Sequence, residues 1–166
     1  MKRITIDRKE YTIEFSIEAT LYNECTEKVM DLMVSAGVTE AEVNDENLSA
    51  KEKTSIMADA FTKNVSDVPQ KALTLFYAGL MEHHGEFGDR TVLSIHEAKR
   101  LLVAYMKENE GLTLYDIMNE MIGEMSKDHF FEKIGVDKMV KNASETAEKE
   151  IKKPQDHKRK SKVGNN

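Results

Sequence analysis

The sequence has few of the features on which secreted proteins and membrane proteins usually depend. Its 166 residues contain one cysteine, Cys25, so no disulfide can form within the chain, as expected of a protein in a reducing cytoplasm. No apolar run approaches the roughly 18 residues of a transmembrane helix. The start, MKRITIDRKEYTIEF, has no continuous apolar segment of the kind that signal peptides carry. We therefore expect one cytoplasmic domain, possessing neither a membrane span nor a signal peptide.

Motifs for chemistry are also missing. Gly79, Gly85 and Gly88 are followed by no GKS or GKT and preceded by no predicted strand, so they do not form a phosphate-binding loop. No G-x-S-x-G is present for a hydrolase nucleophile. Cys25 lies on the apolar side of a predicted helix, which indicates packing rather than nucleophilic chemistry. We predict a protein that is not an enzyme, with no catalytic residues and no cofactor.

The segment MEHHGEFGD holds the only pair of adjacent histidines, His83 and His84. Neighbours on a helix point about 100° apart, whereas zinc-binding helices place two histidines four residues apart on one face. We predict that a helix ends here, where histidine suits the negative end of the helix dipole. A metal-dependent enzyme is the alternative, and it would require a stoichiometric metal. It would be built on His83, His84 and His96, and Glu82, Glu86 and Asp89 could converge with His84 and His96 through the loop.

The net charge of −6 is unevenly distributed. Residues 1–151 hold 18 basic and 29 acidic side chains, or −11, whereas residues 152–162 hold six Lys or Arg and one Asp, or +5. An acidic body repels nucleic acid, so only the tail could bind it. From Lys138 onward the chain has too few apolar residues for a core. We predict a hairpin plus helical domain over 1–137 and a fraying helix with a disordered charged tail over 138–166.

The first fifteen residues predict a β-hairpin. RITI and EYTIEF each alternate apolar and polar residues, the period of a half-buried strand, and DRKE, residues 7–10, would form the turn. A hairpin alone is marginal in water, so its apolar face must pack on another element.

Helices are predicted for most of the remaining chain. The first would span residues 17–36, with Ser16 as N-cap and Gly37 as the C-terminal stop. Residues 38–49 read as an exposed loop, and a weaker helix would follow over 50–63.

The later helices have clearer start signals. Pro69 is expected in the first turn of a helix, where its missing N–H has no consequence. Ser94 with Glu97, and Thr113 with Asp116, match the capping-box pattern. The fold class predicted is mostly α, with an N-terminal β-hairpin packed on a small multi-helix bundle and a disordered basic C-terminal tail.

The sequence is rich in methionine, with ten residues, and their positions bear on how the protein binds partners. Most of them lie on or beside the predicted apolar stripes. Methionine fills gaps in a core, which spacing alone favours, but Met-rich surfaces also bind varied partners. The candidate residues for a partner-binding or self-association surface are Phe76, Tyr77, Leu80, Met81, Phe130 and Phe131.

Four segments carry a resemblance to a known family. ITIDRKEYTIEFSIEATLYNE, VPQKALTLFYAGLMEHHG, SIHEAKRLLVAYMKE and YDIMNEMIGEMSKDHFFEK occur in this order. Together they cover about residues 3–134, and they resemble the tail assembly chaperones of long-tailed (siphovirus-type) phages and prophages of Gram-positive bacteria. Arg8 departs from this pattern, because glycine is expected in such a turn.

The resemblance implies a role in binding rather than chemistry. Chaperones of this family coat the long, apolar tape-measure protein, keep it soluble in the host bacterial cytoplasm, and are shed as tail tube subunits replace them. It therefore implies the tape-measure protein, and the tube protein, as partners, self-association on the coated chain, and absence from the mature virion. A short and a frameshift-extended form are usual. The competing hypothesis is a small helical adaptor or regulator whose basic tail, residues 152–162, contacts nucleic acid.

Overall fold

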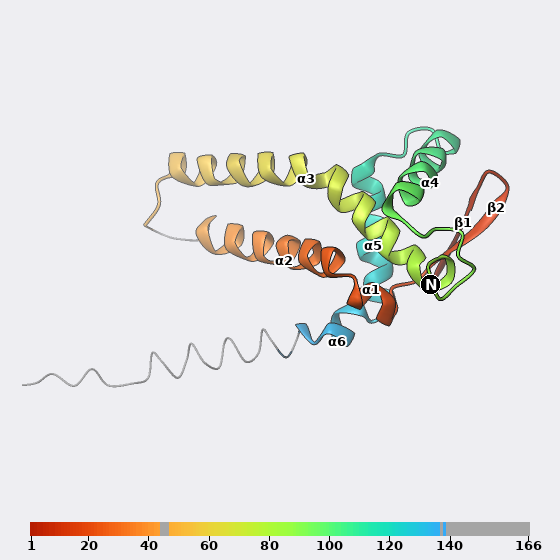
Figure 1. Cartoon of the computed structure of the whole chain (residues 1–166). Coiled ribbons are helices and arrows are strands. Elements are labelled where there is room, and N and C mark those ends of the chain that lie inside the picture. Colours follow the sequence, from red (N-terminus) through yellow and green to blue (C-terminus); the bar gives the residue numbers. More distant parts are fainter. Residues whose placement is uncertain (44–46, 137, 139–166) are drawn as a thin grey trace, which may run out of the picture. The chain divides into compact units, whose positions relative to one another are not determined.

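The computed structural model describes residues 1–43, 47–136 and 138, and it confirms a mostly α fold with an N-terminal β-hairpin (Figure 1). The chain divides into two units, residues 1–134 and 135–166. In the second unit, the amide of Lys138 donates to the carbonyl of Gly135 at 3.1 Å. The predicted charged tail lies outside the described residues from position 139 onward, and so does the basic run at 152–162.

The hairpin consists of β1 (Lys2–Ile6) and β2 (Lys9–Ile13), paired antiparallel with Ile4 opposite Tyr11. The four-residue turn predicted over DRKE is wrong, because Lys9 and Glu10 belong to β2. The turn is the pair Asp7–Arg8, with φ of 50° and 65°. Two consecutive residues at positive φ form the mirror-image turn that matches strand twist. Arg8 thus occupies a position that favours glycine.

The hairpin packs on α3 (Ala50–His84) at Gly79. The Glu14 amide, just after β2, donates to the Gly79 carbonyl at 2.8 Å. A Cβ placed on Gly79 would lie 2.6 Å from Cγ2 of Ile13 and 3.3 Å from Cζ of Phe15. Ile13 and Phe15 are fully buried. The glycine of the FYAGL segment therefore permits the close approach of strand and helix.

The helix predicted over residues 17–36 is two helices, α1 (Ile17–Leu21) and α2 (Asn23–Val43). Ser16 caps α1 as predicted, accepting a hydrogen bond from the Glu18 amide at 3.1 Å. Tyr22 breaks the helix with an extended backbone (ψ 96°), and its ring packs edge-on against Tyr77 with centroids 5.4 Å apart. The Gly37 stop is wrong, as is the loop over residues 38–43, because α2 continues to Val43.

α3 is one helix in place of the two predicted around residue 66. Ser49 and Glu52 form a reciprocal capping box at its start. Pro69 lies inside the helix rather than in its first turn, so that prediction is wrong. Proline removes the hydrogen bond to the Val65 carbonyl, but both residues are exposed, so water can reach that carbonyl. Figure 1 shows α3 changing direction between its two halves.

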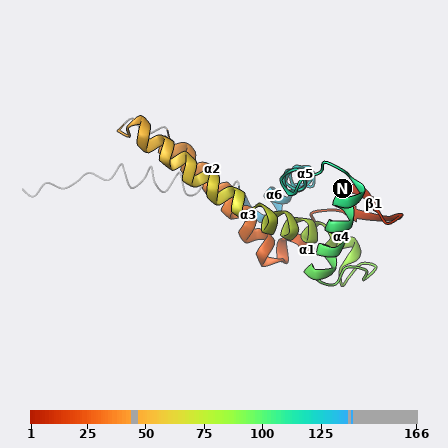
Figure 2. The ribbon, with the colours of Figure 1, turned by 90° about the horizontal axis from the view of Figure 1, so that it is seen from above.

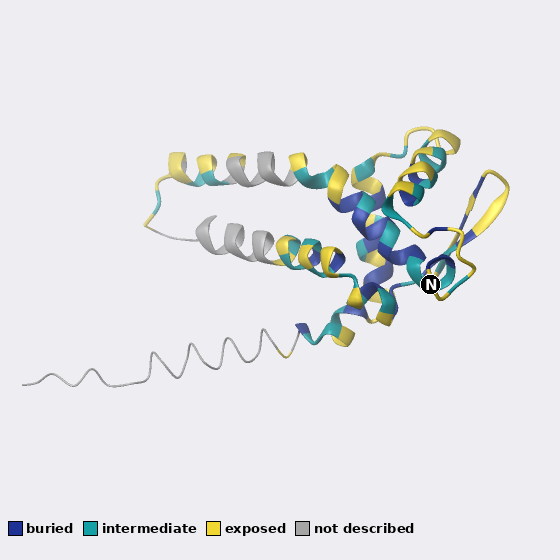
Figure 3. Cartoon of the chain, in the orientation of Figure 1, coloured by how far each residue is buried: buried dark blue, intermediate teal, exposed yellow. Residues whose placement is uncertain are grey.

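α2 and the first half of α3 lie side by side and extend away from the other elements (Figures 1 and 2). We call this helical pair, residues 23–43 and 50–66, the arm. Among the described residues of its α3 segment, none is buried, whereas the second half of α3 is buried on nearly all sides (Figure 3). One helix thus serves both as half of the arm and as the centre of the core.

The remaining helices are α4 (Ile95–Glu108), α5 (Leu114–Lys127) and α6 (Phe130–Ile134). Thr113 and Asp116 form the predicted capping box of α5. For α4 the box is half right: Ser94 accepts from the Glu97 amide, but the Glu97 carboxylate accepts from the Leu93 amide at 2.6 Å. α5 packs on α3 and contributes to the core Ile117, Met118, Met121 and Met125.

Candidate functional site

The six residues predicted to bind a partner do not share one accessible surface. Phe76, Leu80 and Phe130 are 0% exposed, so they are core residues in this fold and offer nothing to a partner. Tyr77 and Phe131 are half-buried and pack against that core, and Met81 is half-buried on α3.

The reason for this burial lies in the ring contacts around α3 and α6. Phe130 meets Phe15 edge-on with centroids 5.9 Å apart, and Phe76 stacks on Tyr105 at 6.5 Å. The two aromatics of the DHFFEK segment therefore differ in position: Phe130 lies in the core, and Phe131 packs against its edge.

An outward apolar face lies instead on α1. Ile17 and Leu21, one turn apart, are 58% and 69% exposed, while Ala19 between them is fully buried. We call Ile17 and Leu21 the α1 apolar face. It was missed in the sequence because Leu21 continued the apolar stripe of a longer predicted helix. On the arm, Met33 and Val65 are also exposed, at 39% and 52%.

A second exposed apolar group sits on the loop that follows α3. Phe87 is 79% exposed, the largest value among the described large hydrophobic side chains. The loop around it is fastened to the end of α3, because the amides of Asp89 and Val92 donate to the carbonyls of His83 and His84, each at 2.8 Å. This loop presents Phe87 from a fixed backbone.

The adjacent histidines hold the hairpin to the end of α3. The Thr12 amide donates to Nε2 of His84 at 2.9 Å, so the imidazole carries its proton on Nδ1, which faces Asp89 at 3.1 Å. His83 pairs through Nε2 with the carboxylate of Glu14 at 2.7 Å. As predicted, α3 ends at His84. Across the described residues, no group of three or more His, Cys, Asp or Glu side chains could hold a metal ion.

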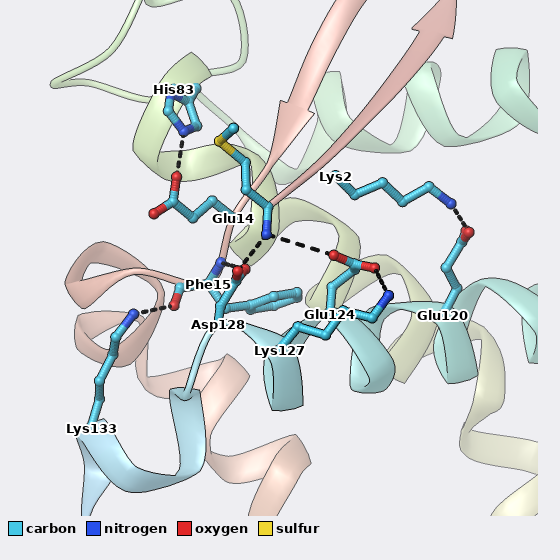
Figure 4. A network of polar contacts seen from close by, with 10 residues as sticks. Lys2, Glu14, Phe15, His83, Glu120, Glu124, Lys127, Asp128 and Lys133 are labelled. Atoms are coloured by element: carbon cyan, nitrogen blue, oxygen red, sulfur yellow. Dashed lines mark hydrogen bonds and ion pairs between the residues drawn. The ribbon is translucent and has the colours of Figure 1, made fainter.

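A polar cluster fastens the first strand to α5 and α6 (Figure 4). The Met1 ammonium contacts the carboxylates of Asp128 and Glu124, which are almost buried. The Phe15 amide donates to Asp128 at 2.9 Å, and the Lys133 ammonium donates to the Phe15 carbonyl at 3.0 Å. Burial acts to raise the pKa of Asp128, but these donors outweigh it and the pKa lies below its ordinary value.

Two further polar side chains, Cys25 and Ser16, are held within the fold. Cys25 is fully buried, and burial raises the pKa of its thiol to about 12, so it holds no thiolate near neutral pH. The Ser16 hydroxyl is engaged by the Glu82 carboxylate and by the first turn of α1.

Two charged helix faces complete the surface. The α4 basic face consists of exposed residues His96, Lys99, Arg100, Val103 and Lys107. At 100° per residue they lie within about 100° of arc. The α2 acidic face consists of exposed residues Glu24, Glu27 and Asp31, within about 60° of arc.

Comparisons with protein-family models, with curated protein sequences and with solved structures each gave no match for this chain. Within the described part of the chain, no helix combines the length and the apolarity needed to cross a lipid bilayer. The surfaces that the described residues present are the exposed apolar residues on α1, the loop bearing Phe87, and two helix faces of opposite charge.

Proposed function

We propose that this protein is a tail assembly chaperone that binds the tape-measure protein of a long-tailed phage and keeps it soluble until the tail tube assembles. The observation that carries the proposal is the α1 apolar face. Ile17 and Leu21 expose more than half of their surface although the core lies directly beneath them. A chaperone that holds an apolar chain in solution needs such residues on its outside.

The order of elements supports the same proposal. The resemblance to tail assembly chaperones covers about residues 3–134, and the first compact unit of the structure spans Met1–Ile134. The FYAGL segment places Gly79 where the hairpin crosses α3, so the resembling segments coincide with contacts that the fold needs. The acidic charge of residues 1–151 would keep a coated complex soluble.

The α1 apolar face also differs in kind from the surface predicted from the sequence. Phe76, Leu80 and Phe130 stabilise the monomer, so substituting them would test folding rather than binding. Ile17 and Leu21 contribute little burial, so polar replacements there should leave the fold intact. This separation allows the proposal to be tested without a folding defect.

The test is co-expression with the tape-measure protein encoded nearby, followed by sedimentation of the lysate and pull-down. We expect the tape-measure protein to be soluble only with this chain. The double variant Ile17→Ser/Leu21→Ser should lower the soluble, co-purifying fraction severalfold. The matched control, Leu93→Ser/Tyr115→Ser, removes apolar residues that are 47% and 58% exposed outside α1 and should change little.

Two results would contradict the proposal. One is a tape-measure protein that stays insoluble and does not co-purify with the unaltered chain. The other is an equal loss in the α1 variant and its control.

Removing residues 152–166 should leave partner binding intact, whereas an adaptor that uses its basic tail would lose salt-sensitive binding to DNA or RNA.

A further inference from the structure

The α4 basic face is unusual for this chain because it gathers positive charge on an acidic protein. Residues 1–151 carry a net charge of −11, yet the α4 basic face contains three Lys or Arg side chains and no carboxylate. Among the described residues, Lys99, Arg100 and Lys107 form no ion pair. This basic face is thus not neutralised by the fold itself.

The carboxylates of α4 are engaged away from that face. Glu97 accepts a hydrogen bond from the Leu93 amide at 2.6 Å, and Glu108 accepts one from the Asp7 amide at 2.9 Å. At 100° per residue both point about 110° or more from the centre of the basic face. The positive side chains of α4 therefore face outward, whereas its two carboxylates accept hydrogen bonds from amides of the preceding loop and of the hairpin turn.

The α2 acidic face has the complementary charge and the same spacing. Glu24, Glu27 and Asp31 follow steps of three and four residues, as do Arg100, Val103 and Lys107 on α4. Each set spans about 10 Å along its helix axis. Glu27 and Asp31 form no ion pair with any described residue.

The two faces belong to different parts of the first unit. α2 extends along the arm, whereas α4 packs against the core half of α3 (Figures 1 and 2). A contact between them must therefore join two molecules. Because the two faces are different surfaces, each copy would keep one face free for the next, which gives head-to-tail association into a ring or an open chain of copies.

We propose that the α4 basic face of one copy binds the α2 acidic face of a second copy, by charge complementarity around Val103. The inference rests on the proposed function in one respect, because copies that coat one long partner must lie next to each other. Exposed ion pairs are individually weak, so the contact is weak in free solution and is strengthened when both copies hold the same chain.

The test uses the purified protein alone, by sedimentation equilibrium between 0.1 M and 1 M NaCl, over which the Debye length falls from about 10 Å to about 3 Å. We expect concentration-dependent association that goes beyond a dimer and weakens with salt. Lys99→Glu/Arg100→Glu, or Glu27→Lys/Asp31→Lys, should each weaken it about tenfold or more. All four positions are exposed, and circular dichroism checks that each variant is folded.

The charge swap provides the sharpest outcome. In a mixture of the two reversed variants, the acidic α4 face of one variant meets the basic α2 face of the other. The unaltered basic α4 face of the second variant also meets the unaltered acidic α2 face of the first. Association should therefore return in the mixture. The control Arg8→Glu/Lys51→Glu makes the net charge more negative by the same amount as the α4 reversal, at exposed positions elsewhere, and should keep the self-association of the unaltered chain.

Several results would overturn the inference. These are a monomer at several hundred micromolar in 0.1 M salt, an equal loss in the control, or no recovery in the mixture. Salt-sensitive binding of a mixed-sequence single-stranded oligonucleotide that is lost with the α4 reversal would assign the face to nucleic acid instead. The sedimentation experiment contains no tape-measure protein. If the purified protein associates in it but the co-expressed tape-measure protein stays insoluble, only the proposed function is refuted.

Discussion

Adding one methyl group at Gly79 should destabilise the protein, although alanine is the better helix former. In a helix interior Gly→Ala alone stabilises by about 1 kcal/mol. At Gly79 the new Cβ would lie 2.6 Å from Cγ2 of Ile13, about 1 Å inside the optimal separation of two carbon atoms. Ile13 and Phe15 are 0% exposed, so neither can move away freely.

The steric cost should exceed the gain in helix propensity. Overpacking a filled core costs about 1–3 kcal/mol, and the hydrogen bond from Glu14 to the Gly79 carbonyl, at 2.8 Å, keeps the strand in place. We expect Gly79→Ala to lower the free energy of unfolding by about 1–2 kcal/mol. Urea unfolding followed by circular dichroism measures this change.

Gly123 provides the matched control, because it lies in α5 and a Cβ there meets nothing within 4 Å. Gly123→Ala should raise the free energy of unfolding by about 0.5–1 kcal/mol. Ile13→Leu, which removes Cγ2 at nearly constant volume, should reduce the cost of Gly79→Ala in a double-mutant cycle. The reasoning is refuted if Gly79→Ala is as stable as the unaltered protein, or if Ile13→Leu leaves its cost unchanged.

Four other outcomes are expected. Arg8→Gly should stabilise the hairpin turn by about 0.5–1 kcal/mol, because Arg8 has φ of 65°; an unchanged urea midpoint would contradict this. His84→Leu should cost about 1–3 kcal/mol, since it removes the acceptor of the half-buried Thr12 amide, and that amide should then exchange faster with solvent. Asp128→Asn should cost about 1–3 kcal/mol at pH 7. Because folding lowers the pKa of Asp128, its contribution is present above the unfolded value of about 3.9 and is lost as pH falls through the lower folded value, so variant and parent should converge only below about pH 4. The Cys25 thiol should react with a thiol reagent only after unfolding, as burial and a pKa of about 12 prevent attack; rapid labelling of the native protein would disprove its burial.

Local signals predicted the parts of the fold that depend on neighbouring residues. The capping box of Thr113 and Asp116 needs only a helix start and two side chains three residues apart, and it forms as predicted. The alternation of the hairpin likewise follows from one buried face. Gly37 predicted the end of a helix and Pro69 the start of one, but α2 continues past Gly37 and α3 continues through Pro69. Proline removes one hydrogen bond of the ladder, and at an exposed position water can replace it, so the helix need not end there.

The surfaces were harder to predict because periodicity reveals an apolar stripe but not which part of it remains uncovered. Leu21 and Phe76 both belonged to apolar stripes, yet Leu21 is 69% exposed and Phe76 is fully buried. The break between α1 and α2 falls at Tyr22, whose ring contacts Tyr77 far along the chain, and such a contact is not visible in local spacing. The α4 basic face, by contrast, could have been read from the spacing of Lys99, Arg100 and Lys107 on one predicted helix.

α3 is one continuous helix, but its two halves differ in burial and can therefore unfold separately. The same backbone passes from a segment, residues 50–66, in which no described side chain is buried, to one enclosed on nearly all sides from Lys71 to Leu80. Opening of the exposed half need not disturb the enclosed half, and Pro69 already interrupts the hydrogen-bond ladder between them. Amide hydrogens of a single helix should therefore exchange on two timescales, with the boundary at a residue that has no amide hydrogen.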